Sequence, residues 1–248
     1  MSTDVKLLDS YCSEFFGYGN LGSKLWFIGM EEGGGDKYEQ VQRRFAAWAK
    51  WGRPRLMCAA SFHKELELPK DFFTEGAPLQ YTWNKLIHLC MKANGEKTEP
   101  DRERRRKFQI YELGRPNSNH CLLELLPLPS PSGSKWLYGK WFPVVAWLAN
   151  RNSYRQRYLL KREKAIQCLV RRYRPKVVIM YGLANIESWQ RISRSSLRCA
   201  ADRKIRKGRH QGVTYISIPH PRNISLSILG DVGKSIRSII HTPANIPT

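Results

Sequence analysis

Residues 24–36 read KLWFIGMEEGGGD, and this stretch decides the fold of the chain. Its apolar run is bounded by lysine and glycine, which is typical of a buried strand, and the glycines after it allow a tight backbone turn with free amides. Two carboxylates, Glu31 and Glu32, fall in that turn. Residues 213–223 have the same form, because an apolar strand stops at a polar loop that carries His220. Loops at the carboxyl ends of neighbouring strands form the ligand crevice of an open α/β sheet, so we expect the two stretches to share one site.

The remaining chain alternates strands with helices. Apolar runs predict further buried strands over 121–129 and 176–181, and helical spacing predicts helices over 7–16, 36–51, 81–91, 154–173, 184–192 and 226–240. Asp36 is expected to cap the second helix, which would place the glycine turn at a helix N-terminus, where an anion could bind. This alternation predicts an α/β fold, a three-layer α/β/α sandwich around a central, mostly parallel four-stranded sheet. We expect one domain over 1–248, with an irregular basic insertion around 55–115 and a basic loop around 193–212.

Charge points to a polyanionic partner. The chain carries 42 Lys and Arg against 21 Asp and Glu, a net charge of +21. This excess is extreme for an enzyme of small metabolites, and binding to a polyanion would fall steeply with salt. A basic surface kept only for solubility is the weaker interpretation, since acidic residues serve solubility better.

Cysteine spacing and hydropathy bear on cofactors and location. The six cysteines are scattered without a Cys-x-x-Cys pair, which argues against a zinc or iron–sulfur site, so we expect no metal and no other cofactor. The N-terminal residues show no secretory signal, and no apolar stretch approaches the ~20 residues that span a bilayer. We therefore expect a cytoplasmic protein without a membrane partner, and no protein partner is indicated.

Two short motifs resemble those of the uracil-DNA glycosylase superfamily. They are Gly29-Met30-Glu31-Glu32-Gly33, similar to a strand that ends in a Gly-x-x-x-Gly turn, and His220-Pro221-Arg222-Asn223, similar to a late strand that ends in His-Pro. Glu31 stands where members usually carry Asp or Asn, and Glu32 where they usually carry Pro. The order of elements is similar over roughly residues 20 to 240. The resemblance implies a glycosylase that cuts the N-glycosidic bond of a base flipped out of double-stranded DNA. No lysine stands out as a Schiff-base nucleophile, so a monofunctional enzyme is expected.

By this resemblance, Glu31 orients the attacking water and faces the cationic sugar, while His220 hydrogen-bonds the base oxygen as it becomes anionic. Glu32 is the rival carboxylate, because two adjacent acids repel and one of them could serve only to hold the loop. The flipped base would stack on an aromatic ring. The sequence leaves open which ring this is, and the base-contact candidates are Tyr38, Tyr81, Trp83 and, in the first motif, Met30.

Glu124 interrupts the apolar run 121–129, and a charge among leucines costs free energy unless it is paired or functional. In the superfamily this place commonly holds an Asn that reads the Watson–Crick edge of uracil. A carboxylate accepts hydrogen bonds but cannot donate to a carbonyl, so Glu124 suits cytosine N4–H better than uracil O4. The alternative is an acid at a strand end that pairs with an arginine.

Polar and basic residues near the motifs are expected to contact DNA. In the loop after His-Pro, Arg222, Asn223 or Ile224 could wedge into the gap that the flipped base leaves. Candidates for phosphate contacts are Arg203, Lys204, Arg206 and Lys207 in the basic loop, and Lys135 and Lys140, which alternate with the aromatic residues Trp136, Tyr138, Trp141 and Phe142. Those aromatic residues could instead belong to the core.

The substrate base stays open. An enzyme that removed normal cytosine would destroy its host's genome, so a cytosine-type base would have to be modified. The chain here resembles the anti-phage glycosylases of the superfamily, which excise glucosylated hydroxymethylcytosine from phage DNA, and Gly33-Gly34-Gly35 would leave room for a bulky 5-substituent. Two alternatives are a repair glycosylase for uracil or another deaminated base, and a nucleic-acid-binding protein that has kept the fold without catalysis.

Overall fold

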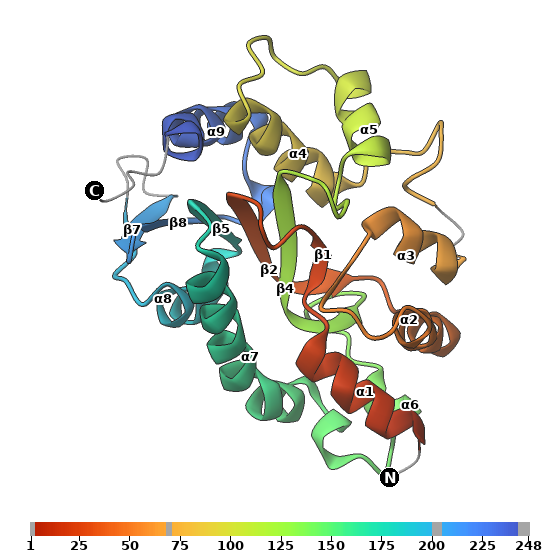
Figure 1. The fold of residues 1–248 in the computed structure, drawn as a ribbon. Coiled ribbons are helices and arrows are strands. Elements are labelled where there is room, and N and C mark those ends of the chain that lie inside the picture. The colour runs from red at the N-terminus through yellow and green to blue at the C-terminus, as the bar shows by residue number, and fades with distance from the viewer. Residues whose placement is uncertain (1–2, 68–70, 200–204, 243–248) are drawn as a thin grey trace.

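One mixed sheet lies at the centre of the protein. The structure is a computed structural model that describes residues 3–67, 71–199 and 205–242. Within them the sheet has eight strands in the order β3-β1-β4-β2-β5-β8-β7-β6 (Figure 1). The four central strands are parallel and correspond to the four apolar runs of the sequence: β4 (His120–Ser130), β2 (Leu25–Gly33), β5 (Val177–Tyr181) and β8 (Val213–Ile218). The prediction of a mostly parallel sheet is therefore confirmed.

The expected number of four strands was wrong, because short strands extend both edges. These are β1 (Gly17–Gly19) and β3 (Leu56–Met57) beside β4, and β7 (Arg206–His210) and β6 (Arg198–Cys199) beside β8. The β7 strand pairs antiparallel with β8 within the segment that was expected to be a basic loop. Arg and Lys on an edge strand oppose pairing with another chain, and such a strand has no apolar pattern to reveal it.

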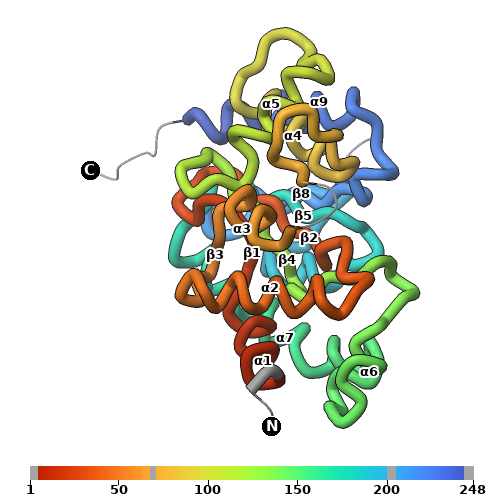
Figure 2. Tube along the Cα trace, turned by 90° about the vertical axis from the view of Figure 1, so that its right-hand side faces the viewer, coloured from red at the N-terminus to blue at the C-terminus, as the bar shows by residue number. Residues whose placement is uncertain are grey.

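Helices cover both faces of the sheet. In Figure 1, α4 (Tyr81–Ala93), α5 (Arg102–Tyr111) and α9 (Leu226–His241) lie on one side of it, whereas α1 (Thr3–Glu14), α7 (Arg151–Tyr173) and α8 (Ile186–Ser193) lie on the other. Figure 2 shows α2 (Tyr38–Lys50) and α3 (Ala59–Leu66) in front of β1 and β4. The remaining helical pieces are α6 (Tyr138–Trp141) and the 3-10 turns η1 (Ala146–Leu148), η2 (Leu183–Asn185) and η3 (Pro221–Asn223). No described helix is long and apolar enough to cross a membrane.

Two expectations about the first half of the chain were wrong. Segment 55–115 is not irregular, because it contains β3, α3, α4 and α5, and α4 packs along α9. Gly233 makes this packing close, since a Cβ there would lie 2.7 Å from the Leu89 carbonyl oxygen. The expected cap is also absent: α2 begins after Lys37, without a side-chain cap from Asp36.

The order of the central strands contains a topological switch point. Along the chain β2 comes first, β4 second, β5 third and β8 fourth, yet β2 lies between β4 and β5. The connections therefore leave β2 towards one edge of the sheet and return on its other side. In open α/β sheets such a switch point marks the ligand site, outside the carboxyl ends of the two strands concerned. Here those ends are Gly29 to Gly33 of β2 and Tyr181 of β5.

Candidate functional site

Gly29 makes room for two polar side chains at the carboxyl ends of the strands. It pairs with Glu124 of β4, and the register that pairs Ile28 with Met180 brings Tyr181 to its other side. A Cβ on Gly29 would overlap both the Tyr181 hydroxyl and Glu124 Oε2. In the space left, Tyr181 Oη donates to Glu124 Oε1 at 3.2 Å. The first glycine of the motif is thus required for space within a strand rather than for a turn.

The surroundings of Glu124 favour the protonated, neutral form of its carboxyl. Part of the residue reaches the surface, but Oε2 is buried and has no hydrogen-bond partner in the described chain. Burial, reinforced by the nearby Glu32 carboxylate, raises the pKa of Glu124 to about 8. The sequence-based prediction took an ionised, accept-only group as its premise, whereas the raised pKa favours a protonated carboxyl, which both donates and accepts.

An ion pair with arginine does not explain Glu124 either. Arg162 of α7 is buried next to it, but its guanidinium donates to the backbone oxygens of Glu124 and Leu125, both at 2.9 Å. Among the described residues, the one hydrogen bond to the Glu124 carboxyl comes from the Tyr181 hydroxyl. Its second oxygen is therefore left without a partner among the described residues.

Glu31 and Glu32 lie in β2 itself, because this strand continues to Gly33 with an irregular register towards its end. Their placement in a glycine turn was wrong. Glu31 Oε2 forms an ion pair with Arg151, the first residue of α7. Arg151 is held in turn by Ser130 Oγ, which accepts from Nη2 at 2.6 Å. Glu31 Oε1 has no hydrogen bond within the described residues, so one carboxylate oxygen can hold a water.

Glu32 is held more completely. Arg44 of α2 donates to Oε2 at 2.7 Å, and the Tyr18 hydroxyl lies 3.0 and 3.1 Å from the two oxygens. The Arg44 side chain is only 4% exposed and that of Glu32 12%. His63 lies 3.9 Å away, but burial and Arg44 lower its pKa to about 3, so it stays neutral. Glu32 therefore joins β2 to α2 and β1, and Glu31 is the less constrained carboxylate.

His220 begins the turn η3, two residues after β8. Its Nδ1 accepts from the Arg222 backbone N–H at 3.2 Å, which leaves the proton of the neutral ring on Nε2. Burial and Arg222 lower the pKa of His220, which favours this neutral form. The imidazole packs edge-to-face on the Tyr181 ring, with 6.1 Å between ring centroids. Tyr181 thus connects His220 to Glu124.

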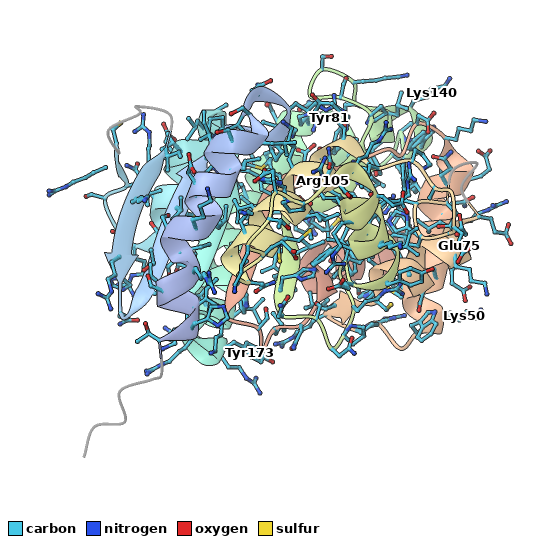
Figure 3. The ribbon with its side chains drawn as sticks, turned by 90° about the horizontal axis from the view of Figure 1, so that it is seen from above. Lys50, Glu75, Tyr81, Arg105, Lys140 and Tyr173 are labelled. Carbon is cyan, nitrogen blue, oxygen red and sulfur yellow. The ribbon has the colours of Figure 1, made fainter. Side chains whose placement is uncertain are left out.

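Helix α4 supports the loop after His220. Lys85 Nζ donates to the Ile224 carbonyl oxygen at 2.9 Å, and the Arg222 guanidinium lies 5.9 Å from the centre of the Tyr81 ring. Tyr81 is 56% exposed, so this ring is available at the surface next to the His-Pro loop. Figure 3 shows Tyr81 on one margin of the molecule, with Lys140 towards the same margin and Tyr173 on the opposite one.

The other aromatic candidates lie in separate clusters. Tyr38 packs against Trp141 and Phe142, and Trp83 packs against Phe73 and the neutral His63. Tyr81 is therefore the ring candidate that the structure brings next to the His-Pro loop. Met30 follows Gly29 in β2 and is partly buried against the core.

The candidate DNA contacts differ in exposure. Arg222 and Asn223 are exposed, but Ile224 is 5% exposed and belongs to the core, so in this conformation it cannot act as a wedge. Lys135, Lys140 and Lys207 are exposed and Arg206 is partly buried, whereas Arg203 and Lys204 lie outside the described residues. Of the interleaved aromatic residues, Tyr138 is buried, and Trp136 stacks on Tyr154 of α7.

Sequence reasoning missed Tyr181, Arg151, Arg44 and Tyr18. Tyr181 carried a signal, because it is the polar end of a predicted strand next to Gly182. Arg151 carried none, since its partner Glu31 lies 120 positions away.

Within the described residues, no cluster of His, Cys, Asp and Glu could hold a metal ion. No model of a known protein family matches this chain, and no curated protein matches it either.

Proposed function

We propose that this protein is a DNA glycosylase of the uracil-DNA glycosylase type, which hydrolyses the N-glycosidic bond of a flipped pyrimidine. One observation carries the proposal: at the switch point of the sheet, an enclosed neutral carboxyl on Glu124 leaves one oxygen unpaired, between Gly29 and Tyr181. Other buried polar atoms of the described chain also lack partners, but Glu124 Oε2 is one that lies at the carboxyl ends of the central strands, where open α/β sheets bind ligands. The net charge of +21 supports DNA as the molecule that delivers the base.

Glu31 and His220 suit the two charges that develop as the bond breaks. The Arg151 guanidinium holds Glu31 in an ion pair, and the carboxylate would face the cationic sugar while Oε1 holds the attacking water. The neutral His220 ring would donate from Nε2 to the base oxygen as negative charge builds there. The products are an abasic site and the free base.

A neutral Glu124 can read either pyrimidine. With cytosine, its O–H would donate to N3 and its other oxygen would accept from N4–H. With uracil, the O–H would donate to O4 and the acceptor would take N3–H. Because Oε2 is buried, a base can reach it only after neighbouring side chains move. We propose a modified cytosine in phage DNA as substrate, on the grounds of host safety and of the resemblance.

Two observations favour the alternatives. A neutral Glu124 carboxyl can donate from one oxygen and accept at the other with uracil as well as with cytosine, so uracil repair is compatible with the site. Both motif carboxylates form ion pairs with arginine, Glu31 with Arg151 and Glu32 with Arg44, which also suits a DNA-binding protein without catalysis. The three functions predict different products.

The test uses duplexes that differ at one position: uracil, cytosine, hydroxymethylcytosine or its glucosylated form. Each is incubated with the protein, and alkali then cleaves the strand wherever an abasic site has formed. We expect cleavage of a modified-cytosine duplex, lost in Glu31→Gln with DNA affinity retained. The matched control is Glu39→Gln, which removes one exposed carboxylate from α2 and should keep wild-type cleavage. Cleavage of uracil alone would support repair, and salt-sensitive binding without any cleavage would support the non-catalytic function.

A further inference from the structure

A small basic cavity lies at the amino-terminal end of β8, whereas the candidate site lies at the carboxyl ends of the central strands. It has a volume of about 50 Å³, is partly open to solvent, and is lined by the C-terminal parts of α7 and α8 and by the hairpin between β7 and β8. Its basic lining residues are Arg171, Arg174, Arg194 and His210, and none of its lining residues is acidic. Because β8 runs about 17 Å from Val213 to Ile218, the cavity is remote from His220.

The basic groups of the cavity lack counter-charges. None of the three arginines forms an ion pair with a described residue, and the one side-chain bond among them joins Arg171 Nη2 to Cys168 Sγ at 3.5 Å. His210 Nε2 is buried and has no hydrogen-bond partner in the same part of the chain. Arg191 of α8, by contrast, pairs with Glu163 at 2.6 Å. The cavity thus combines positive charge with an unused polar nitrogen.

The backbone shows that two of these arginines occupy positions where glycine would be less strained. Arg174 and Arg194 follow α7 and α8 with φ of 48° and 51°, in the left-handed region that helix ends usually fill with glycine. A side chain there costs roughly 1 kcal/mol.

We propose that this cavity binds a phosphate group. Its volume exceeds the ~10–15 Å³ that one water requires and accommodates several water-sized atoms, as a tetrahedral phosphate does. Guanidinium groups bind phosphate oxygens through paired N–H donors, and His210 Nε2 supplies a further donor when it carries the proton. The phosphate comes either from a DNA backbone that passes this edge of the protein or from a free phosphate compound. The site is independent of the proposed glycosylase function.

Glycine substitutions test the site without threatening the fold. Arg174→Gly and Arg194→Gly remove the guanidiniums and relieve the left-handed backbone at the same time. The matched control is Arg53→Gly, since Arg53 also has positive φ, 57°, but follows α2 and lines neither this cavity nor the candidate site. Calorimetric titration with inorganic phosphate should show binding by the wild type and by Arg53→Gly. The double variant should bind about tenfold more weakly or worse.

Equal affinity in all three proteins, or no phosphate binding by the wild type, would overturn the proposal. The source of the phosphate follows from DNA binding measured against salt concentration. If a DNA phosphate fills the cavity, the negative slope of log K against log salt should be shallower by about 0.9 in the double variant than in Arg53→Gly. Inorganic phosphate should also compete with DNA. An unchanged slope, together with lost phosphate binding, would identify a free phosphate compound as the ligand.

Discussion

The substitution Glu124→Gln should remove a pH dependence of stability that the enclosed carboxyl imposes on the wild type. Glutamine keeps the size of the protonated side chain and is neutral at every pH. In the wild type, burial and Glu32 raise the pKa of Glu124 from 4.5 to about 8. Between these values the folded chain holds a proton that the unfolded chain has released. The wild type therefore loses stability as the pH rises through this window.

The two pKa values set the size of the effect. Each pH unit between them lowers the unfolding free energy by up to about 1.4 kcal/mol. From pH 5 to pH 7 the wild type should lose about 2–3 kcal/mol relative to Glu124→Gln, and from pH 5 to pH 9 it should lose about 4 kcal/mol. For a chain of 248 residues, the change between pH 5 and pH 7 corresponds to a difference in Tm of about 5 °C.

Urea titrations of the wild type and Glu124→Gln at pH 5, 6, 7 and 8 measure this difference. Other groups titrate in both proteins, so the quantity of interest is the gap between them at each pH. The exposed Glu39→Gln variant should follow the wild type throughout. If the unfolding free energies of the wild type and Glu124→Gln change in parallel with pH, the assignment of a neutral carboxyl to Glu124 is refuted.

Three further substitutions test the packing of the site by urea denaturation. Gly29→Ala should destabilise the fold by about 1–3 kcal/mol because its Cβ would overlap two side chains, whereas Gly133→Ala, in open space, should not; equal losses would contradict the close approach at Gly29. Glu32→Gln breaks a buried ion pair and should cost about 3–5 kcal/mol, well above the cost of Glu31→Gln; a reversed order would show that Glu31 is the structural carboxylate. Ile224→Ala should cost about 2–5 kcal/mol as a core residue does, and an unchanged stability would return Ile224 to the loop surface.

The sequence was sufficient for the centre of the sheet. Buried parallel strands are mostly apolar runs. Residues 25–28 and 177–181 show this pattern almost without interruption, whereas Glu124 interrupts 121–128, and Thr214 and Ser217 interrupt 213–218. The edge strands could not be found in the same way, because Arg206–His210 has no apolar alternation and its strand geometry depends on pairing with β8.

The first motif shows why a glycine can be misinterpreted from sequence. Gly29 was assigned to a turn, since glycine is common where the backbone must turn. Its actual constraint is the Glu124–Tyr181 contact above it, and neither partner is near it in sequence. Only the register of three strands brings the three residues together.

Charge states and ion pairs were also beyond the sequence. Glu124 stands out in the sequence as an acid among leucines, but its protonation depends on burial and on Glu32 from another strand. The roles of Glu31 and Glu32 depend on Arg151 and Arg44, which come from two different helices. Tertiary partners of this kind leave no local pattern.

The central claim is that Glu31, Glu124, Tyr181 and His220 line one site for an extruded base. The most direct measurement is a crystal structure of the protein with a duplex that contains one 2′-fluoro modified cytidine, whose fluorine slows loss of the base. The claim predicts a base outside the helix, with its Watson–Crick edge at Glu124 Oε2 and its carbonyl oxygen within hydrogen-bond distance of His220 Nε2. A base that stays stacked in the duplex, or one bound away from these side chains, would contradict it.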